Sequence, residues 1–172
     1  MVDLGLPSGL LWAKCNLGAN TETGLGDYFA FGETTPRAAG WETDAPYDWA
    51  HAPFNNGSSS YNSSYFTAHK SEWFNDDVLK PEYDAVTVNM GTGWRMPTMA
   101  DFEELLSDTN NEWVENYNGT DINGYKFTNK SDASKYIFIP ASGFRDGSSV
   151  RYVDSRGIVW SSSLGSSSLS YA

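Results

Sequence analysis

The chain has 172 residues, enough for one domain that buries roughly 70% of the surface exposed by its unfolded form. Its 11 basic and 22 acidic side chains give a net charge of −11, which opposes binding to nucleic-acid phosphates. A single cysteine, Cys15, excludes an intrachain disulfide and zinc sites built from paired cysteines. No apolar run approaches the roughly 20 residues that cross a bilayer, and the N-terminus lacks the pattern of a signal peptide, so we expect no membrane insertion.

The first half of the chain predicts two short strands and a long loop. Apolar runs bounded by turn residues favour strands over Leu10–Cys15 and Tyr28–Phe31. From residue 33 to about residue 80 the periodicity is lost, while aromatic residues stand singly among Gly, Ser and Asn. A loop of this length must be pinned by its aromatic side chains or be partly mobile.

Two short helices are predicted in the middle of the chain. Pro81 suits the first turn of a helix over residues 81–88, which Asn89 and Gly91 would end. Thr98 is a good N-cap for a second helix, with Asp101 three residues later. Helical spacing predicts a core-facing side for this second helix, formed by Met99, Phe102, Leu105 and Leu106.

The second half reads mainly as sheet. Asn-Gly and Asp-Gly pairs at residues 118, 123 and 146 indicate turns. Between and after them lie strand-like segments at Tyr125–Thr128, Tyr136–Ile139, Val150–Val153 and Gly157–Trp160. Two short helices followed by such strands predict an α+β fold with small antiparallel sheets and long loops.

Several separated blocks resemble the Fibrobacter succinogenes major paralogous domain family, which is common in gut Bacteroidetes. The opening block runs from Val2 to Ala19 and is followed by Gly-Asp-Tyr-Phe-Ala-Phe-Gly-Glu-Thr at residues 26–34. Later matches are Tyr83-Asp84-Ala85, Gly-Trp-Arg-Met-Pro-Thr at 93–98, Ile-Pro-Ala-Ser-Gly-Phe-Arg-Asp-Gly at 139–147 and Trp-Ser-Ser-Ser at 160–163. The resemblance implies one C-type-lectin-like domain over residues 1–172.

The end of the chain departs from the family pattern, which continues past the Trp-Ser-Ser-Ser block into a closing strand beside the N-terminal one. This chain stops at residue 172. Either the chain is truncated or another segment completes the sheet, and an open edge beside Leu10–Cys15 would invite a second copy or a strand-donating partner.

The Gly-Trp-Arg-Met-Pro-Thr block is also similar to a block of formylglycine-generating enzymes, which share the lectin-like fold. We interpret it as scaffold, with Trp94 and Arg95 inside and Arg95 pinning a loop through hydrogen bonds. Those enzymes use cysteines late in the chain, and this sequence has none there, which disfavours that activity and leaves an enzyme of unknown type as a weak alternative. The structural motif then comprises Trp94, Arg95, Pro97, Thr98 and Trp160.

No cofactor is predicted. His51 and His69 show no ligand spacing and are interpreted as exposed loop residues. Asp44 and the run Asn75-Asp76-Asp77 offer oxygens for calcium, but no motif of a calcium-dependent lectin accompanies them.

The segment from residue 145 mixes Ser, Tyr, Arg and Asp, as antibody binding loops do. In lectin-like variable proteins diversified by retroelements, the corresponding late segment carries the exchangeable residues. The resemblance therefore implies a protein or glycan ligand and a location on a cell surface, outside the cell or on a phage particle. The alternatives are that Ser and Gly only fill turns, or that the chain is an assembly module of a larger surface protein. The predicted ligand-binding residues are Ser148, Ser149, Arg151, Tyr152, Asp154, Ser155 and Arg156, with Trp41 and Trp49 as neighbours.

Overall fold

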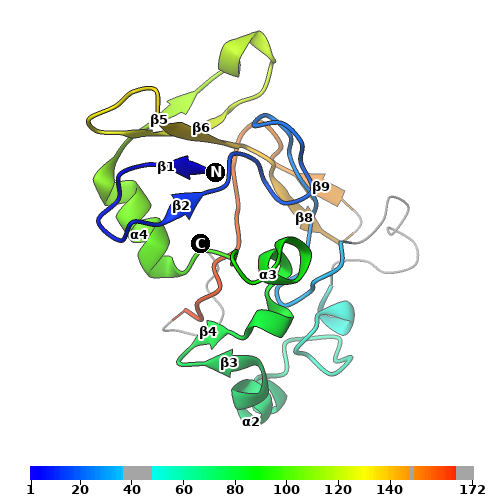
Figure 1. The fold of residues 1–172 in the computed structure, drawn as a ribbon. Coiled ribbons are helices and arrows are strands. Elements are labelled where there is room, and N and C mark those ends of the chain that lie inside the picture. Colours follow the sequence, from blue (N-terminus) through cyan, green and yellow to red (C-terminus); the bar gives the residue numbers. More distant parts are fainter. Residues whose placement is uncertain (37–47, 148, 166–172) are drawn as a thin grey trace. The chain divides into compact units, whose positions relative to one another are not determined.

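The computed structural model describes residues 1–36, 48–147 and 149–165 (Figure 1). The protein is α+β, with three α-helices and small antiparallel sheets among the described residues. It divides into two compact units, each assembled from segments far apart in the sequence. The first unit comprises Met1–Asp27, Met99–Phe144 and Arg151–Ile158, and the second comprises Tyr28–Thr98, Arg145–Val150 and Val159–Ala172.

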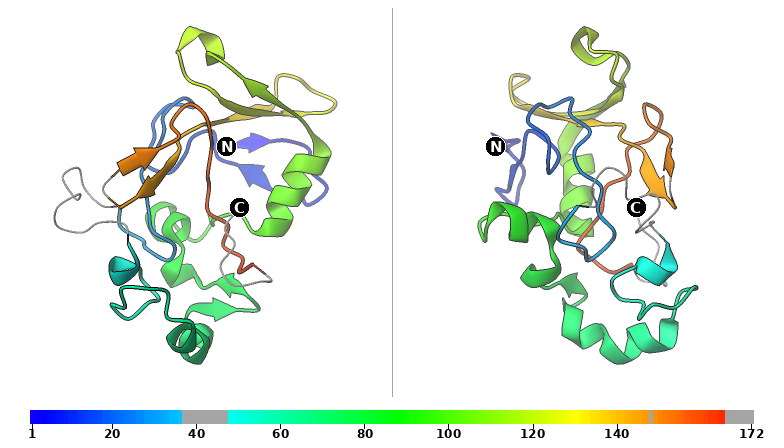
Figure 2. Two further views of the ribbon diagram at one scale, coloured as in Figure 1. Left: turned by 180° about the vertical axis from the view of Figure 1, so that it is seen from behind. Right: turned by 90° about the vertical axis from the view of Figure 1, so that its right-hand side faces the viewer.

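The first unit is built on a three-stranded antiparallel sheet in the order β5–β6–β7, formed by Thr109–Val114, Gly124–Asn129 and Tyr136–Pro140. Figure 2 shows the light-green helix α4, Met99–Asp108, running directly into β5 at one end of this sheet. A short 3-10 turn at Tyr117–Gly119 joins β5 to β6. Strands β6 and β7 contain the segments predicted from sequence at residues 125–128 and 136–139, so both predictions are confirmed.

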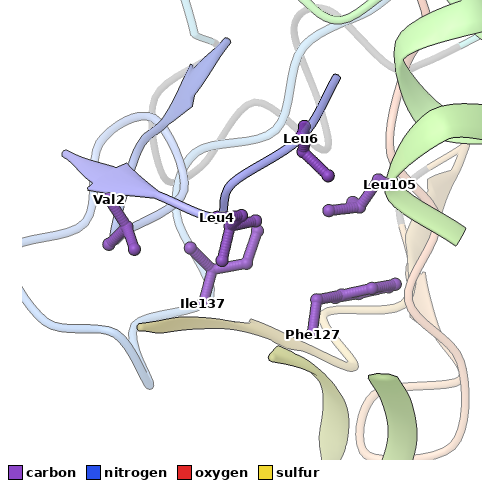
Figure 3. Close-up of a cluster of buried hydrophobic side chains, with 6 residues drawn as sticks. All are labelled: Val2, Leu4, Leu6, Leu105, Phe127 and Ile137. Carbon is purple, nitrogen blue, oxygen red and sulfur yellow. The ribbon is translucent and has the colours of Figure 1, made fainter. Parts of the chain in front are cut away.

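The N-terminal ribbon supplies the rest of this unit's core. Strand β1, Val2–Asp3, pairs with β2, Leu11–Trp12. Apolar side chains from the N-terminal segment interdigitate with side chains from α4 and from one face of the sheet (Figure 3). The cluster consists of Val2, Leu4, Leu6, Leu105, Phe127 and Ile137, and Leu4 and Leu105 are each 1% exposed.

The second unit is rich in short elements around an aromatic core. It contains a 3-10 turn at Trp49–His51, helix α2 at Ser63–Trp73, the hairpin of β3, Phe74–Asn75, with β4, Val78–Leu79, and a 3-10 turn at Pro81–Tyr83 followed by helix α3, Ala85–Met90. Residues 162–164 pair along β4, with Leu79 N–H donating to Ser162 O at 2.9 Å. The buried core residues are Phe31, Phe66, Trp73, Phe74, Leu79 and Met96.

The last two strands lie on either side of residue 147 in the sequence. Strand β8, Phe144–Asp146, pairs with β9, Ser149–Arg151. Strand β9 overlaps the strand predicted at residues 150–153. Residues 157–160, all of them described, form only an isolated bridge at Gly157 instead of the predicted strand.

Polar side chains hold the loops of both units. Asn55 is 2% exposed, and its amide group donates to the carbonyls of Trp49, Ser58 and Ser60 and accepts from Asn62 N–H. The long segment predicted as a loop is therefore organised from within by an amide, in addition to the aromatic side chains that pack in the core.

Asp84 also holds loop backbone in the second unit through its side chain. Its Oδ1 accepts from Val86 N–H and Thr87 N–H at 2.8 and 3.0 Å, which caps α3, and its Oδ2 accepts from Met96 N–H at 2.8 Å. The helix predicted over residues 81–88 is consequently two elements, because the cap at Asp84 starts a new helix after the 3-10 turn. Gly91, with φ of 90°, ends α3 as predicted, whereas Asn89, predicted to end the helix with it, lies inside α3.

Three other predictions from the sequence are corrected. Residues 63–73, predicted as part of a loop, form α2, which Asn62 caps through Tyr65 N–H. Residues 28–31, all described, do not form a strand, because Glu33 folds the chain into a turn by accepting from Ala30 N–H. The strand predicted over residues 10–15 is confined to Leu11–Trp12.

No helix among the described parts of the chain is both long and apolar enough to cross a membrane.

Leu105 and Leu106 provide a matched test of the first unit's core. Leu105 is 1% exposed, whereas Leu106, predicted to face the core, is 54% exposed. Leu105→Ala should lower the free energy of unfolding by about 2–5 kcal/mol through lost contacts and a cavity, while Leu106→Ala should change it by about 0.5 kcal/mol or less. Urea unfolding followed by tryptophan fluorescence measures both, and equal effects would contradict the assigned face of α4.

Candidate functional site

Residues 152–156 form a tight turn at the surface of the first unit. Tyr152 and Asp154 both adopt positive φ, at 60° and 61°, in the left-handed region that residues other than glycine rarely occupy. The turn closes on the carbonyl of Tyr152, which accepts from Ser155 N–H at 3.1 Å and from Arg156 N–H at 3.0 Å. A conformation of this kind persists only where the surrounding structure holds it.

The backbone after β7 holds this turn. Asp154 N–H donates to Ala141 O at 2.8 Å, and Gly143 N–H donates to Arg156 O at 2.8 Å. Ala141 is fully buried, so the turn is anchored to a fixed part of the unit. A bridge between Gly143 and Gly157 continues the same pairing.

Asn123 holds the turn from a second direction. Its Nδ2 donates to Asp154 O at 2.9 Å, its Oδ1 accepts from Asn116 N–H at 2.9 Å, and its backbone carbonyl accepts from Ala141 N–H at 2.8 Å. One residue thus ties three segments together. In the sequence, Asn123 is read only as part of an Asn-Gly turn, and its role depends on a contact with a residue 31 positions away.

Gly143 allows the turn to approach this closely. A Cβ atom placed on Gly143 would lie 2.1 Å from Arg151 O and 2.8 Å from Val153 N, and the residue has φ of 64°. Only glycine fits both the conformation and the space. Ala141 and Gly143, within the block at residues 139–147, therefore support the turn.

The turn and the adjoining Arg151 present one aromatic and two basic side chains to solvent. The ring of Tyr152, which is 48% exposed, stacks on Phe144 with centroids 5.7 Å apart and planes inclined by 27°. The Arg156 guanidinium lies 4.3 Å from the centroid of the Tyr152 ring, in cation–π geometry. Arg151, Ser155 and Arg156 are exposed.

Asp154 differs from its neighbours in the turn. It is only partly exposed, and its Oδ1 is buried without a hydrogen-bond partner among the described residues. Although Asp154 was predicted to bind ligand, half of its carboxylate is turned away from solvent. The outer surface of the turn is therefore set mainly by Arg and Tyr.

The remaining predicted ligand-binding residues lie elsewhere or outside the described part of the chain. Ser149 is an exposed residue of β9 in the second unit. Trp49 is 42% exposed in the 3-10 turn of that unit, where its ring packs on Tyr61 at 5.4 Å. Trp41 and Ser148 lie outside the described residues.

All five residues predicted as scaffold belong to the second unit, where they make different contacts. Arg95 is exposed, not inside as predicted, and its Nη1 donates to Met96 O at 3.1 Å, while Trp94 is half-buried with its carbonyl accepting from Thr87 Oγ1. Pro97 and Thr98 are half-buried, and Pro97 O accepts from Ser162 N–H at 2.8 Å. Trp160 Nε1 donates to Phe29 O at 2.9 Å and the ring packs on Phe31.

Arg145 makes a contact that sequence reasoning missed. Its guanidinium lies 5.0 Å from the centre of the Tyr28 ring. Burial raises the pKa of Tyr28, and the positive charge of Arg145 partly opposes that rise. The pair joins two family-like blocks within the second unit, and no spacing in the sequence indicates it.

The histidines and the residues considered for calcium have local partners. His51 Nδ1 lies 2.6 Å from Asp48 Oδ1, and a hydrogen bond from the His51 side chain lowers the pKa of Asp48. His69 Nδ1 lies 2.8 Å from Glu72 Oε1. His51 is exposed at the end of a 3-10 turn, whereas His69, predicted as an exposed loop residue, is partly buried and lies in helix α2.

The run at residues 75–77 is part of a hairpin. Asp76 and Asp77 have φ of 46° and 62° and make the two-residue turn between β3 and β4, where Asp77 pairs with Lys70. Asp44 lies outside the described residues. Within the described ranges, no group of three or more His, Cys, Asp or Glu side chains could hold a metal ion.

Comparison of the chain with known proteins gave no match to a family model, a curated protein or a solved structure. Its function therefore has to be inferred from the geometry of the chain itself.

Gly143→Ala should displace the turn without unfolding the first unit. The new methyl group would collide with Arg151 O, so the bonds of the turn to Ala141 and Gly143 should weaken. Amide hydrogen exchange at Asp154 should then become faster, by about tenfold if roughly 1.4 kcal/mol of protection is lost. Gly119→Ala is the matched control, because Gly119 also has positive φ, at 75°, but nothing lies within 4 Å of its Cβ position. Faster exchange at Asp154 in both variants would show that close approach at Gly143 does not hold the turn.

Proposed function

We propose that this chain is a non-enzymatic ligand-binding module with a C-type-lectin-like fold, related to the Fibrobacter succinogenes major paralogous domain family. It recognises a protein or glycan through the turn at residues 152–156 and the adjoining Arg151, on a cell surface, outside the cell or on a phage particle. The observed α+β architecture with small antiparallel sheets is compatible with this fold.

The observation that carries the proposal is the combination of a braced backbone with exposed recognition side chains. The turn is bonded to Ala141, Gly143 and Asn123, whereas Tyr152 and Arg156 are exposed. A loop held in its binding conformation loses little conformational entropy when it binds. Tyr and Arg are also the side chains most often responsible for binding energy at protein interfaces.

A second candidate is an assembly module of a larger surface protein. Leu11, in the two-stranded ribbon of β1 and β2, is 48% exposed, and an apolar side chain on such a short ribbon favours pairing with another strand. Multi-angle light scattering distinguishes the two candidates. Assembly through this edge predicts a dimer that Leu11→Lys converts to a monomer, whereas a monomer at all concentrations argues against it.

The proposed binding site is tested by replacing Arg151 and Tyr152 together with alanine. The probes are a glycan array and a set of purified cell-surface proteins, each screened first with the unaltered chain. Binding to any ligand so found should weaken on the order of tenfold or more, because two central anchors are lost. The midpoint of urea unfolding should stay the same, since both side chains are exposed.

The control variant changes the same two residue types elsewhere. Arg95 is exposed and Tyr125 is 44% exposed, and neither belongs to the turn, so Arg95→Ala with Tyr125→Ala should leave binding intact. Undiminished binding by the Arg151 and Tyr152 variant would refute the assignment of the site to this turn.

A further inference from the structure

The chemistry of the turn narrows the class of ligand. We propose that the ligand is a protein segment in which an Asp or Glu carboxylate lies beside apolar side chains, and that Arg156 binds the carboxylate. This inference rests on the proposed function and goes beyond it by naming the ligand's chemistry and the residue that reads it.

Arg156 is placed for carboxylate recognition. Its guanidinium lies over the Tyr152 ring at 4.3 Å, and that ring stacks in turn on Phe144. A guanidinium that stacks through its face keeps the N–H groups at its edge for a bidentate bond to a carboxylate. The ring also restricts the long arginine side chain before binding, which lowers the entropy cost of forming that bond.

The segment that carries Arg156 also exposes apolar side chains. Tyr152, Val153 and Ile158 are 48%, 38% and 38% exposed, so the segment that carries Arg156 also presents apolar surface, and the Tyr152 ring lies directly against the guanidinium. Burial of these side chains would be favourable only against an apolar partner. A sulfated polysaccharide offers anionic groups but little apolar surface, whereas a protein segment with Leu, Ile or Phe beside Asp or Glu offers both.

The charge of the chain also favours a short acidic segment over a long polyanion. The net charge is −11, which repels an extended polyanion. Beyond about 8 Å at physiological salt this repulsion is screened, so a single carboxylate responds mainly to the side chains near it. Between residues 151 and 158 the acidic side chain is Asp154, whose Oδ1 is buried, while Arg151 and Arg156 are exposed.

The experiment is a selection from a random dodecapeptide library against the intact, immobilised chain. The enriched peptides should carry Asp or Glu next to aliphatic or aromatic residues. Fluorescence titration with the corresponding synthetic peptides should show binding about tenfold weaker for Arg156→Gln, from loss of the charged hydrogen bonds. Arg156→Lys should weaken peptide binding less than Arg156→Gln does, because lysine keeps the positive charge but cannot form the bidentate bond. Arg95→Gln, at an exposed arginine outside the turn, is the control and should bind like the unaltered chain.

A double-mutant cycle tests the pairing itself. Replacing the peptide's Glu by Gln should weaken binding to the unaltered chain about as much as Arg156→Gln does. The same peptide change should have little further effect on binding to Arg156→Gln.

Three outcomes would overturn the inference, and they separate it from the proposed function. Suppose the enriched peptides contain no acidic residue but bind the Tyr152→Ala variant more weakly than the unaltered chain. The turn would then remain the binding site, and recognition of a carboxylate would be refuted. Peptides whose binding is unchanged by Tyr152→Ala and Arg156→Gln, or no enriched peptide at all, would count against the turn as a peptide-binding site. Binding to heparin that depends on Arg156 and that selected peptides do not compete away would identify a polyanion as the ligand.

Discussion

Asn55, Asp84, Asn123 and Asn129 each hold two or more backbone groups of loops that have little secondary structure of their own. Asn129, for example, donates from Nδ2 to Leu4 O at 2.8 Å and accepts at Oδ1 from the N–H groups of Ser131 and Asp132. Buried backbone groups must find partners, and in strands of two to six residues the ladders supply few of them. Amide and carboxylate side chains supply the rest. Each unit depends on two such residues as well as on its apolar core.

The candidate site is also held by hydrogen bonds from a side-chain amide to loop backbone. The turn at residues 152–156 contains two non-glycine residues with positive φ, and it is stabilised by Asn123 and by backbone bonds to Ala141 and Gly143. Since Ala141 is fully buried, the position of the turn is determined by the packing of β7 and its continuation. The geometry of the exposed surface is thus inherited from the core of the first unit.

Sequence patterns correctly predicted the helix and strands whose formation depends on neighbouring residues in the chain. Helix α4, which starts directly after Thr98, was indicated by Thr98 as a candidate cap and by the spacing of Phe102 and Leu105, and β6 and β7 were indicated by short strand-like segments between turns. Helix α2 was not predicted, because only two of its residues, Phe66 and Trp73, are buried and they are seven positions apart, which gives a weak amphipathic pattern.

Long-range contacts explain the parts that could not be predicted. The hairpin turn at Asp76 and Asp77 lacks the usual glycine, so its sequence does not mark it. In the candidate site, composition indicated the exposed Tyr152 and Arg156, but the roles of Asn123 and Gly143 arise from contacts with a segment that lies far along the chain. Such roles become visible only when the two segments are seen together.

The bonds that shape the turn run through main-chain atoms and Asn123, while residues 151, 153, 155 and 156 are exposed and the Ser155 hydroxyl bonds locally to Tyr152 O. Shape and chemistry are therefore encoded by different residues. Mutations at these outward positions can exchange one specificity for another while the frame is inherited unchanged, which makes the turn a natural place for a new binding preference to evolve or to be grafted.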